Sequence, residues 1–428
     1  MIFKKFMEND QYPKDLFLLL LVGGLFTLST ALSNTFVNIF LWKQSGEITD
    51  IAFYNLAIVV MQPIAFNWAG WLAKKVDRVI VLRIGVFILA LFYIGMLFMG
   101  TLASSYLLAL GAILGFGLGF YWLAFNVLTL EVTEPETRDF FNGYLGVLNS
   151  FSGMLGPLSA GFIITRMDKQ MGYETIFSIS MILFLVAVVI SFFLQRRKAD
   201  GHYGLKEVFQ ERKVNHDWQQ LLRAHLFQGL REGTFLFLIV IWVYTATKSE
   251  FALGTFGFVQ SIVSFIGYYA VSHFLKPWQR KQAIFAGGLL LFISPIMLLF
   301  PISFSLLIIY GISVSVAYPL LLVPYVSITY DIIGKCRGIY EKRIEYIVVR
   351  ELYLNIGRII SILTFIIVVS YFSEERGIPM LLPVLGAGHF FIYFCLKKVS
   401  VPSNPIDSAA ESIEFAETQQ DGNNSNKQ

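Results

Sequence analysis

The chain has 428 residues and a formal net charge of +4; 56% of its residues are hydrophobic and only 14% are charged. Soluble domains carry about 25% charged residues because they must cover their surface with polar groups, so this composition excludes a soluble globular protein. The apolar residues also occur in long blocks, and the mean hydropathy is +0.65. We therefore expect a polytopic membrane protein.

Twelve apolar runs, each bounded by charged residues, are long enough to cross the roughly 30 Å hydrocarbon core of a bilayer. We predict transmembrane helices near 16–42, 50–73, 79–101, 105–130, 139–165, 172–195, 221–246, 252–275, 282–301, 303–329, 346–371 and 379–396. The predicted fold class is an all-α membrane protein whose twelve transmembrane helices form two pseudo-repeated six-helix bundles. The bundles would comprise 1–195 and 221–399, joined by a solvated cytoplasmic linker at 196–220 and followed by a disordered cytoplasmic tail at 400–428.

Positively charged residues are distributed unevenly between alternate loops. Of the 33 Lys and Arg residues, one set of loops contains only Lys43, Arg166, Lys169, Lys248 and Arg376. Because cytoplasmic loops carry the excess of Lys and Arg, this distribution predicts a multi-pass protein of the plasma (cell) membrane with both termini in the cytoplasm.

Three predicted helices carry polar side chains on one face. Asn34 and Asn38 lie one turn apart in the first helix, and Asn126 lies in the fourth. The eleventh helix carries Glu351, Asn355 and Arg358. Polar groups in lipid are costly unless they meet water or one another, so these faces predict a water-filled central cavity ringed by apolar helices, among them the third, sixth and ninth. Interhelical hydrogen bonding without any solute is the alternative.

The loop between the second and third helices contains the sequence GWLAKKVDR at 70–78. It is similar to the Gly-x-x-x-Asp-Arg/Lys-x-Gly-Arg signature of the major facilitator superfamily. Gly70 and Arg78 match this signature, whereas Lys74 stands at the signature Asp and Asp77 at the second Gly. In that family the Asp helps to lock the two bundles together at the cytoplasmic face. The resemblance therefore implies that the lock is weakened here or shifted to Asp77.

A second motif lies in the fifth helix. Gly143, Ser152, Gly156-Pro157 and Ala160-Gly161 resemble the superfamily's antiporter motif, Gly-x8-Gly-x3-Gly-Pro-x2-Gly-Gly. Small residues at this spacing let two helices approach closely and the proline bends the helix, so plain helix packing is the alternative interpretation. In the family this motif is associated with exporters that exchange a solute for protons, and the resemblance thus implies export.

Two further sequences, REG at 231–233 and RELYLNIGR at 350–358, resemble the YqgE-type branch of bacterial permeases in this superfamily. The resemblance to the superfamily covers the whole membrane part of the chain, 14–398. The sequence RDFFNG at 138–143 is also echoed by the start of 350–358, which gives modest support for a duplicated six-helix bundle.

Charged side chains within the seventh and eleventh helices are candidates for a functional role. An unpaired charge at the bilayer centre costs about 2.5–3.5 kcal/mol on insertion scales, so we expect these groups to cluster where the two helices meet. The residues are Arg231, Glu232, Arg350, Glu351 and Arg358. One interpretation is a structural ion-pair network. The other is a transport site in which Arg358 contacts an anionic group of a solute and Glu232 or Glu351 takes up a proton.

Other features limit the function classes. Glu131, at the inner end of the fourth helix, is expected to be a gate residue that pairs with Arg138, and the lone His389 to be a packed histidine. The chain lacks the Gly-x-x-x-x-Gly-Lys-Ser/Thr loop of ATP-driven pumps and has no soluble domain long enough for catalysis. We therefore expect no enzyme activity, no cofactor, no metal site and no nucleic-acid partner.

The predicted function is secondary transport by alternating access, with proton-coupled export of a small or amphiphilic solute by a monomer in the lipid bilayer. The candidate solute-binding or coupling residues are Asn34, Asn38, Asn126, Arg231, Glu232, Glu351, Asn355 and Arg358. The candidate gating or motif residues are Gly70, Lys74, Asp77, Arg78, Glu131, Arg138, Gly143, Gly156 and Pro157. A lipid or glycolipid flippase and a non-transporting membrane sensor or scaffold remain as alternatives.

Overall fold

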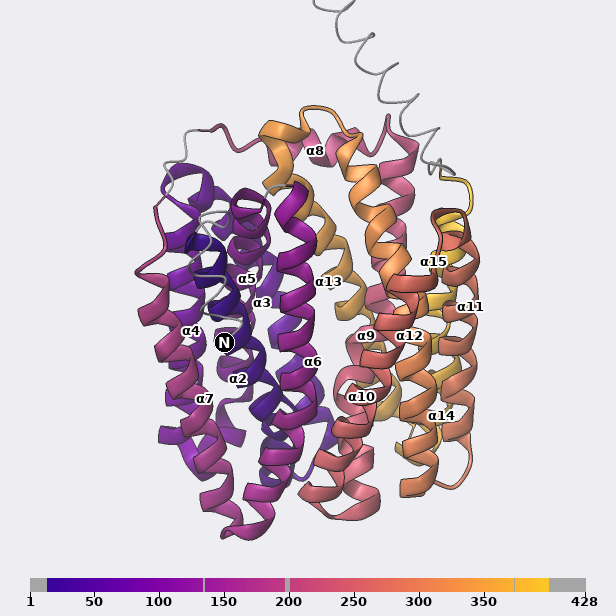
Figure 1. Ribbon diagram of the computed structural model, residues 1–428. Helices are drawn as coiled ribbons and strands as arrows, with labels where there is room; N and C mark the ends of the chain where they lie inside the picture. Colours follow the sequence, from indigo (N-terminus) through magenta and orange to yellow (C-terminus); the bar gives the residue numbers. More distant parts are fainter. Residues whose placement is uncertain (1–13, 134, 197–200, 373, 400–428) are drawn as a thin grey trace, which may run out of the picture.

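The computed structural model describes residues 14–133, 135–196, 201–372 and 374–399, which are almost entirely helical (Figure 1). The N-terminal bundle consists of α2 (Lys14–Ser45), α3 (Ile48–Lys75), α4 (Arg78–Met99), α5 (Leu107–Val132), α6 (Pro135–Arg166) and α7 (Lys169–Ser191). The C-terminal bundle consists of α9 (His216–Thr247), α10 (Glu250–Phe274), α11 (Arg280–Ile293), α12 (Phe304–Gly334), α13 (Ile339–Tyr371), α14 (Glu374–Gly386) and α15 (Gly388–Leu396). The tail that we expected at 400–428 lies outside the described residues.

Eleven segments of the described chain are long and apolar enough to span a membrane. One of them, Arg78–Thr129, has 52 residues, and at about 1.5 Å per residue it would be more than twice as long as the hydrocarbon core of a bilayer is thick. The 3₁₀ segment η1 (Gly100–Tyr106) interrupts it, and Gly100 adopts a φ of +47° that few other residues tolerate. The segment therefore contributes two spans, α4 and α5, and the described chain provides the twelve spans that its apolar runs predicted.

The ninth and twelfth spans are interrupted near prolines. Helix α11 continues as the 3₁₀ segment η3 (Ser294–Leu299), which contains Pro295, and η2 (Pro277–Gln279) precedes it. The twelfth span is divided into α14 and α15. The start of α15 lies directly against α9, because a Cβ atom on Gly388 would be only 2.4 Å from the carbonyl oxygen of Phe227. This contact brings the residue after Gly388, His389, close to the middle of α9.

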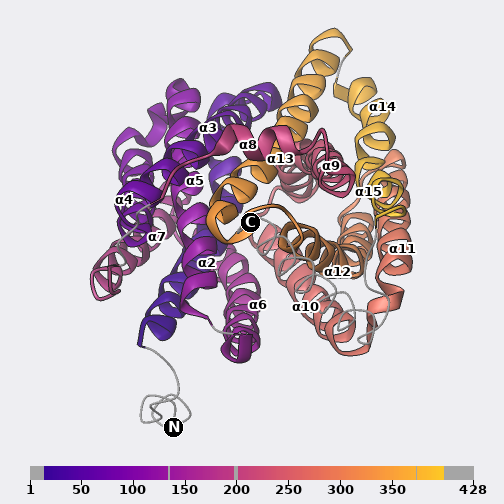
Figure 2. The same cartoon turned by 90° about the horizontal axis from the view of Figure 1, so that it is seen from above.

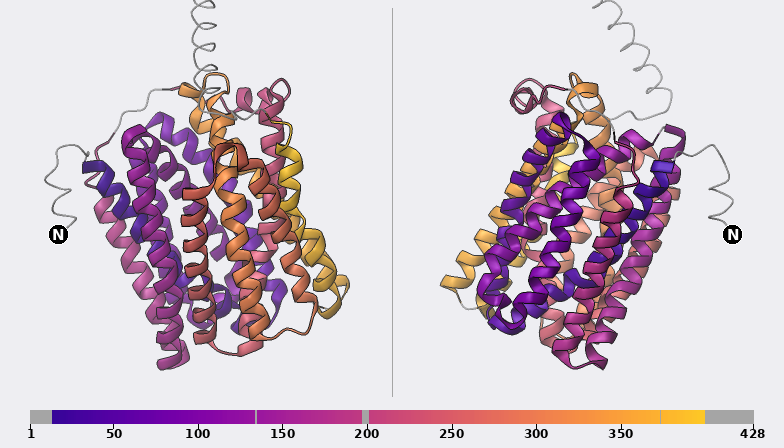
Figure 3. Two further views of the ribbon diagram at one scale, coloured as in Figure 1. Left: turned by 45° about the vertical axis from the view of Figure 1, so that its right-hand side comes forward. Right: turned by 90° about the vertical axis from the view of Figure 1, so that its left-hand side faces the viewer.

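The two bundles lie side by side, and two helix pairs make most of the contacts between them (Figures 1 and 2). Helix α3 packs against α13, and α6 packs against α10. Helices α4 and α7 lie on the outer side of the N-terminal bundle, and α11, α14 and α15 on the outer side of the C-terminal bundle (Figure 2). In Figure 3 the helices of both bundles run along a common direction. The apolar third, sixth and ninth spans are thus peripheral.

Glycine allows the closest helix contact of the C-terminal bundle. A Cβ atom on Gly229 of α9 would lie 2.0 Å from the carbonyl oxygen of Leu354, and one on Gly357 of α13 would lie 2.1 Å from that of Leu226. No side chain fits at either position, so the backbones of α9 and α13 touch. This contact places the charged side chains of the two helices within hydrogen-bonding reach.

The linker helix α8 (Leu205–Glu211) lies across one end of the bundles, which we call the linker face; the other end is the opposite face (Figure 1). Although its outer side chains are exposed, α8 is docked on the C-terminal bundle. Val208 and Trp218 are fully buried, and the Trp218 indole nitrogen donates a hydrogen bond to the carbonyl of Val208 at 3.3 Å. The linker is therefore less solvated than its mixed charges predicted, because one side of α8 is apolar.

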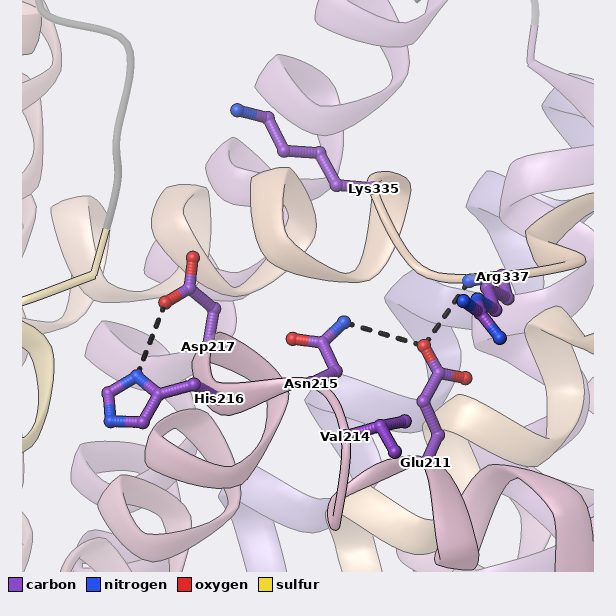
Figure 4. A pocket seen from close by; sticks show the side chains of 7 residues that line it. All are labelled: Glu211, Val214, Asn215, His216, Asp217, Lys335 and Arg337. Atoms are coloured by element: carbon purple, nitrogen blue, oxygen red, sulfur yellow. Dashed lines mark hydrogen bonds and ion pairs between the residues drawn. The ribbon is translucent and has the colours of Figure 1, made fainter. Parts of the chain in front are cut away.

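A pocket of about 440 Å³ lies beside α8, between the α8–α9 turn and the α12–α13 connection (Figure 4). Glu211 Oε1 accepts hydrogen bonds from Asn215 Nδ2 at 3.4 Å and from the backbone N–H of Arg337 at 3.3 Å. Asn215 also caps α9 by accepting a hydrogen bond from the backbone N–H of Trp218. These bonds tie the linker helix to the C-terminal bundle at the linker face.

Candidate functional site

An ion pair links α9 and α13 in the middle of the C-terminal bundle. Arg358 donates hydrogen bonds from Nη2 and Nε to Oε2 of Glu232, at 2.6 Å and 3.2 Å. The side chain of Glu232 is 9% exposed and that of Arg358 is 17% exposed. A buried charge without its partner is strongly unfavourable, so each of these residues depends on the other.

Two more side chains complete the surroundings of the Glu232 carboxylate. Gln228, one turn earlier on α9, donates a hydrogen bond from Nε2 to Oε1 at 2.8 Å. The hydroxyl of Tyr318 on α12 donates to the same oxygen at 3.0 Å. Neither residue was among our candidates. The i−4 spacing could have indicated Gln228, whereas only the packing of α12 against α9 identifies Tyr318.

Polar contacts continue along α13 toward the linker face. Arg358 Nη1 lies 3.4 Å from Asn355 Oδ1, and Asn355 Nδ2 donates to the carbonyl of Glu351 at 2.9 Å. Arg350 Nη2 donates to Glu351 Oε1 at 2.6 Å, so these neighbours form a second ion pair on the same helix. The structure thus places four of the predicted site residues of α9 and α13 in one connected network.

Arg231 precedes Glu232 in sequence but lies on another side of α9, facing α12 and α15. Its guanidinium carbon is 4.9 Å from the centre of the Phe235 ring, and Tyr310 of α12 lies beside it. On the α15 side, a Cβ atom on Gly388 would lie 3.3 Å from the Cβ atom of Arg231. The five charges that we expected to cluster between α9 and α13 are therefore divided, and Arg231 stands apart from the two ion pairs.

The asparagines of the N-terminal bundle join two helices. Asn55 of α3 donates a hydrogen bond from Nδ2 to Asn38 Oδ1 of α2 at 2.9 Å, and Asn38 Nδ2 donates to the carbonyl of Asn34 at 3.2 Å. Asn34 is exposed and Asn126 is half-buried. Asn38 thus supports a helix contact, whereas Asn34 and Asn126 remain accessible. Asn55 was not among the predicted residues.

Lys74 joins the two bundles at the linker face. Its ammonium group forms an ion pair with Glu345 of α13 and donates to the carbonyls of His202 at 2.9 Å and Glu341 at 2.7 Å. Glu345 Oε1 also accepts a hydrogen bond from the backbone N–H of Gly204 at 3.0 Å. The two charged side chains are 7% and 0% exposed. We call these five residues the linker-face latch.

The resemblance to the signature implied that the lock between the bundles is weakened or shifted to Asp77, and the linker-face latch fits neither outcome. Asp77 is buried but stays within the N-terminal bundle, where it accepts a hydrogen bond from the backbone N–H of Val79 and pairs with Arg196 at 3.3 Å. The inter-bundle contact is made by Lys74 with reversed charge, because α13 supplies the anion Glu345. Our prediction missed Glu345 because we began the eleventh helix at 346, whereas α13 begins at Ile339.

The other signature residues also lie at the linker face. Gly70 packs against the linker, since a Cβ atom there would be 3.1 Å from the Tyr203 hydroxyl. Arg78 Nε lies 3.0 Å from Glu131 Oε1, so these two predicted gate residues form an ion pair. We expected Glu131 to pair with Arg138, whose side chain lies outside the described part of the structure.

A second contact between the bundles lies at the opposite face. Lys43, at the end of α2, forms a 2.8 Å ion pair with Glu250 at the start of α10, and the Tyr173 hydroxyl donates to the same carboxylate at 3.2 Å. The Lys43 side chain is 25% exposed, so this contact is less buried than the linker-face latch. We call these three residues the opposite-face latch. Our prediction assigned Lys43 and Glu250 to loops and missed them both.

The antiporter-like motif lies where α6 meets α2 and α10. A Cβ atom on Gly254 of α10 would be 2.4 Å from the carbonyl oxygen of Pro157, and one on Gly156 would be 2.7 Å from the Cβ atom of Ala31. Gly143 lies in the same helix, toward the linker face. The motif therefore allows a close helix contact between the two bundles.

The side chains of these clusters supply ion pairing and hydrogen bonding. Within the described ranges, no group of three or more His, Cys, Asp or Glu side chains could hold a metal ion. Cys336 and Cys395 are both buried and unbridged. The polar network on α9 and α13 contains guanidinium donors and a carboxylate acceptor within hydrogen-bonding distance.

Comparison with known proteins identifies the family. The model of the Major Facilitator Superfamily matches residues 16–335. The chain is 54% identical to the uncharacterized protein YqgE of Bacillus subtilis (strain 168) over 396 residues, which is 92% of each chain. It is 35% identical to the MFS-type efflux pump elcC of Phaeosphaeria nodorum over 114 residues, which is 26% of this chain and 20% of that protein. The crystal structure of the human organic anion transporter MFSD10 (TETRAN) has the same fold, with a TM-score of 0.65 and 14% identity over 90% of this chain and 100% of that one. This twelve-span membrane protein belongs to the major facilitator superfamily of secondary transporters.

Proposed function

We propose that the protein is a proton-coupled antiporter that exports a small, amphiphilic solute by alternating access. The Glu232–Arg358 ion pair, buried where α9 and α13 touch, is the observation that carries this proposal. Ionisable groups inside a membrane protein are costly, and they occur mostly along solute and proton pathways. We also propose that it is a monomer of the plasma membrane, and the distribution of Lys and Arg supports a cytoplasmic linker face.

The coupling step follows from competition for the Glu232 carboxylate. In its charged form the carboxylate accepts hydrogen bonds from Arg358, Gln228 and Tyr318. A donor group of the solute can take one of these places while the carboxylate is charged. A proton on Glu232 removes that acceptor, weakens the hold on Arg358 and releases the solute. Solute and proton therefore occupy the site in turn, which is the requirement for exchange.

The two bundles offer an amphiphilic solute two different surfaces. In the N-terminal bundle, the half-buried Trp122 packs with its ring centre 5.2 Å from that of Phe26, which is itself buried and stacked on the buried Tyr121, so Trp122 is the ring that a solute can reach. The C-terminal bundle offers Glu232 and Arg358. A solute with an apolar body and a polar group would match this division, because each part meets its own kind of surface.

Alternating access requires that the two faces open in turn, and the latches are suited to this task. The linker-face latch and the opposite-face latch each join the N-terminal bundle to the C-terminal bundle. Opening either face separates one of these ion pairs while the other remains. The close contact of Pro157 with Gly254 keeps α6 and α10 packed. We propose export as the direction of transport because this motif resembles the one found in exporters of the family.

The proposal is tested by transport into liposomes after a metabolite-efflux comparison of deletion and overexpression strains has identified a solute. A pH gradient should drive uptake by the wild type. The Glu232→Gln variant should lose this pH-driven uptake and retain exchange of solute without a gradient. Glu351→Gln tests the second carboxylate in the same way. Glu207→Gln, an exposed change on α8, is the matched control.

The measurement decides between coupled transport and a structural ion pair. If Glu232→Gln and Glu351→Gln both concentrate the solute against its gradient as well as the wild type does, the proton-coupled proposal is wrong. If the wild type transports at the same rate with and without a pH gradient, the protein is a uniporter or uses another ion.

A further inference from the structure

Arg231 is a buried cation of α9 that takes part in neither of the two ion pairs on α9 and α13. Arg358 is paired with Glu232, and Arg350 is paired with Glu351. The two ion pairs and Arg231 together contain three cations and two anions. Arg231 is only 3% exposed, and an uncompensated charge at this depth is strongly unfavourable. An anionic group beside Arg231 would remove this cost.

The guanidinium edge that is left without a partner has a defined geometry. Nε and Nη2 of Arg231 are buried and have no hydrogen-bond partner among the residues that the structure describes. These two nitrogens form one side of the planar guanidinium, and their N–H bonds point in parallel. This edge binds the two oxygens of a carboxylate. Arg358 uses the same two nitrogens to hold Glu232.

The neighbouring side chains add polar groups on the same side of α9. His389 of α15 is fully buried, and neither ring nitrogen has a hydrogen-bond partner within the described residues. Its ring meets that of Tyr318 edge-on, with centres 5.5 Å apart. Tyr310 lies beside the Arg231 guanidinium. We call Arg231, Tyr310, Tyr318 and His389 the Arg231 cluster.

We infer that the Arg231 cluster is a binding site for a carboxylate group of the solute. Arg231 would bind both carboxylate oxygens through Nε and Nη2, and His389 would donate one further hydrogen bond. This inference rests on the proposed transport function and adds the chemical class of the solute, a carboxylate-bearing amphiphile. Tyr318 connects the two sites, because its hydroxyl bonds to Glu232 while its ring contacts His389.

A binding experiment on the full-length protein in detergent tests the site without any transport assay. Benzoate is the probe, and benzamide is its uncharged control of nearly the same shape. Isothermal titration should show that the wild type binds benzoate and not benzamide. Arg231→Gln should weaken benzoate binding about tenfold or more, and Arg231→Lys should weaken it less, because the charge remains but the paired donors are lost. Arg223→Gln, an exposed change on the same helix, should bind like the wild type.

Each outcome bears on the inference. Equal binding of benzoate and benzamide by the wild type, or absence of benzoate binding, overturns it. Benzoate binding that survives Arg231→Gln but disappears in Arg358→Gln places the anion at Arg358 and also overturns it. A melting curve of each variant shows that it is folded. This site is measured by equilibrium binding of benzoate and proton coupling by pH-driven uptake, so failure of one and failure of the other remain distinguishable.

Discussion

The two bundles share a fold but differ in the chemistry of their cores. No Asp, Glu, Lys or Arg occurs in 16–42, 51–73, 84–130 or 140–165 of the N-terminal half. In the middle of these spans the buried polar contacts are between uncharged groups, such as Ser29 with Ser180 and Asn38 with Asn55. The C-terminal bundle instead carries guanidinium and carboxylate groups in the middle of α9 and α13. Among the described residues, buried charge in the middle of the spans thus occurs in the C-terminal bundle, whereas the buried charges Lys74 and Asp77 of the N-terminal half lie at the linker face.

This difference indicates a division of labour. Neutral polar groups that are hydrogen-bonded to each other, and stacked rings, are stable in a low-dielectric core. We expect these contacts to persist during transport. The free energy of a core that contains buried charges changes when a proton or an anion binds beside them. We therefore expect the N-terminal bundle to supply shape and the C-terminal bundle to supply the response to ligand and proton.

The largest expected effect comes from removing the charges of the C-terminal core. Arg358→Leu should abolish transport and lower stability by about 3–5 kcal/mol, because it leaves the Glu232 carboxylate buried without its cation. Adding Glu232→Leu to this variant should restore most of the stability and none of the transport. Thermal denaturation and liposome transport measure the two quantities separately. Recovery of transport in the double variant would show that the pair only stabilises the bundle.

The next effect concerns the contact that holds the two bundles together. Lys74→Ala leaves Glu345 without its cation between α3 and α13, so the linker face should open more often. In a cysteine-free background carrying Val348→Cys, which packs against Gly70, a maleimide added from the linker face should react faster. Exchanging the charges, Lys74→Glu with Glu345→Lys, should slow the reaction again.

Lys75→Ala is the control for this experiment, since Lys75 is exposed and lies over the ring of Trp71. An unchanged labelling rate in Lys74→Ala would mean that the buried pair does not hold the face closed. Labelling that rises equally in both lysine variants would point to a general effect of charge near the membrane surface.

A smaller effect is expected in the N-terminal bundle. Asn55→Ala removes the donor to Asn38 and should cost about 1–3 kcal/mol of stability, the usual penalty of an unpaired buried polar group. Transport should continue, because no buried charge is affected. Loss of transport in a folded Asn55→Ala protein would contradict the division of labour and show that the N-terminal core also takes part in the response.

The sequence was sufficient to predict the twelve spans, because each must be about 20 apolar residues long and charges bound it. It also indicated that Glu232 and Arg358 would approach each other, since unpaired charges in α9 and α13 would be too costly. The rest depended on packing. Tyr318 and His389 are ordinary residues of apolar helices until α12 and α15 are placed against α9. Glu345 was hidden because the charged first turns of α13 are indistinguishable from a loop in sequence.

The smallest expected effect compares two ion pairs at the linker face that differ in burial. Lys342 pairs with Glu207 of α8, whose side chain is 55% exposed, whereas the Lys74–Glu345 pair is buried. The hydrogen bond and charge of Lys342 lower the pKa of Glu207 below its usual range. A lowered pKa means that this pair adds stability at neutral pH and loses it as the pH falls through that lowered value.

The melting temperatures of wild type and Glu207→Gln should therefore differ slightly at neutral pH and low salt. The difference should vanish in acid and in about 1 M KCl, where screening acts over only about 3 Å. Lys74→Ala should remain destabilised in high salt, because water and ions do not reach the buried pair. A salt-sensitive defect in Lys74→Ala would mean that the linker-face latch is hydrated. The buried and the exposed ion pair at the linker face would then not differ in their response to salt.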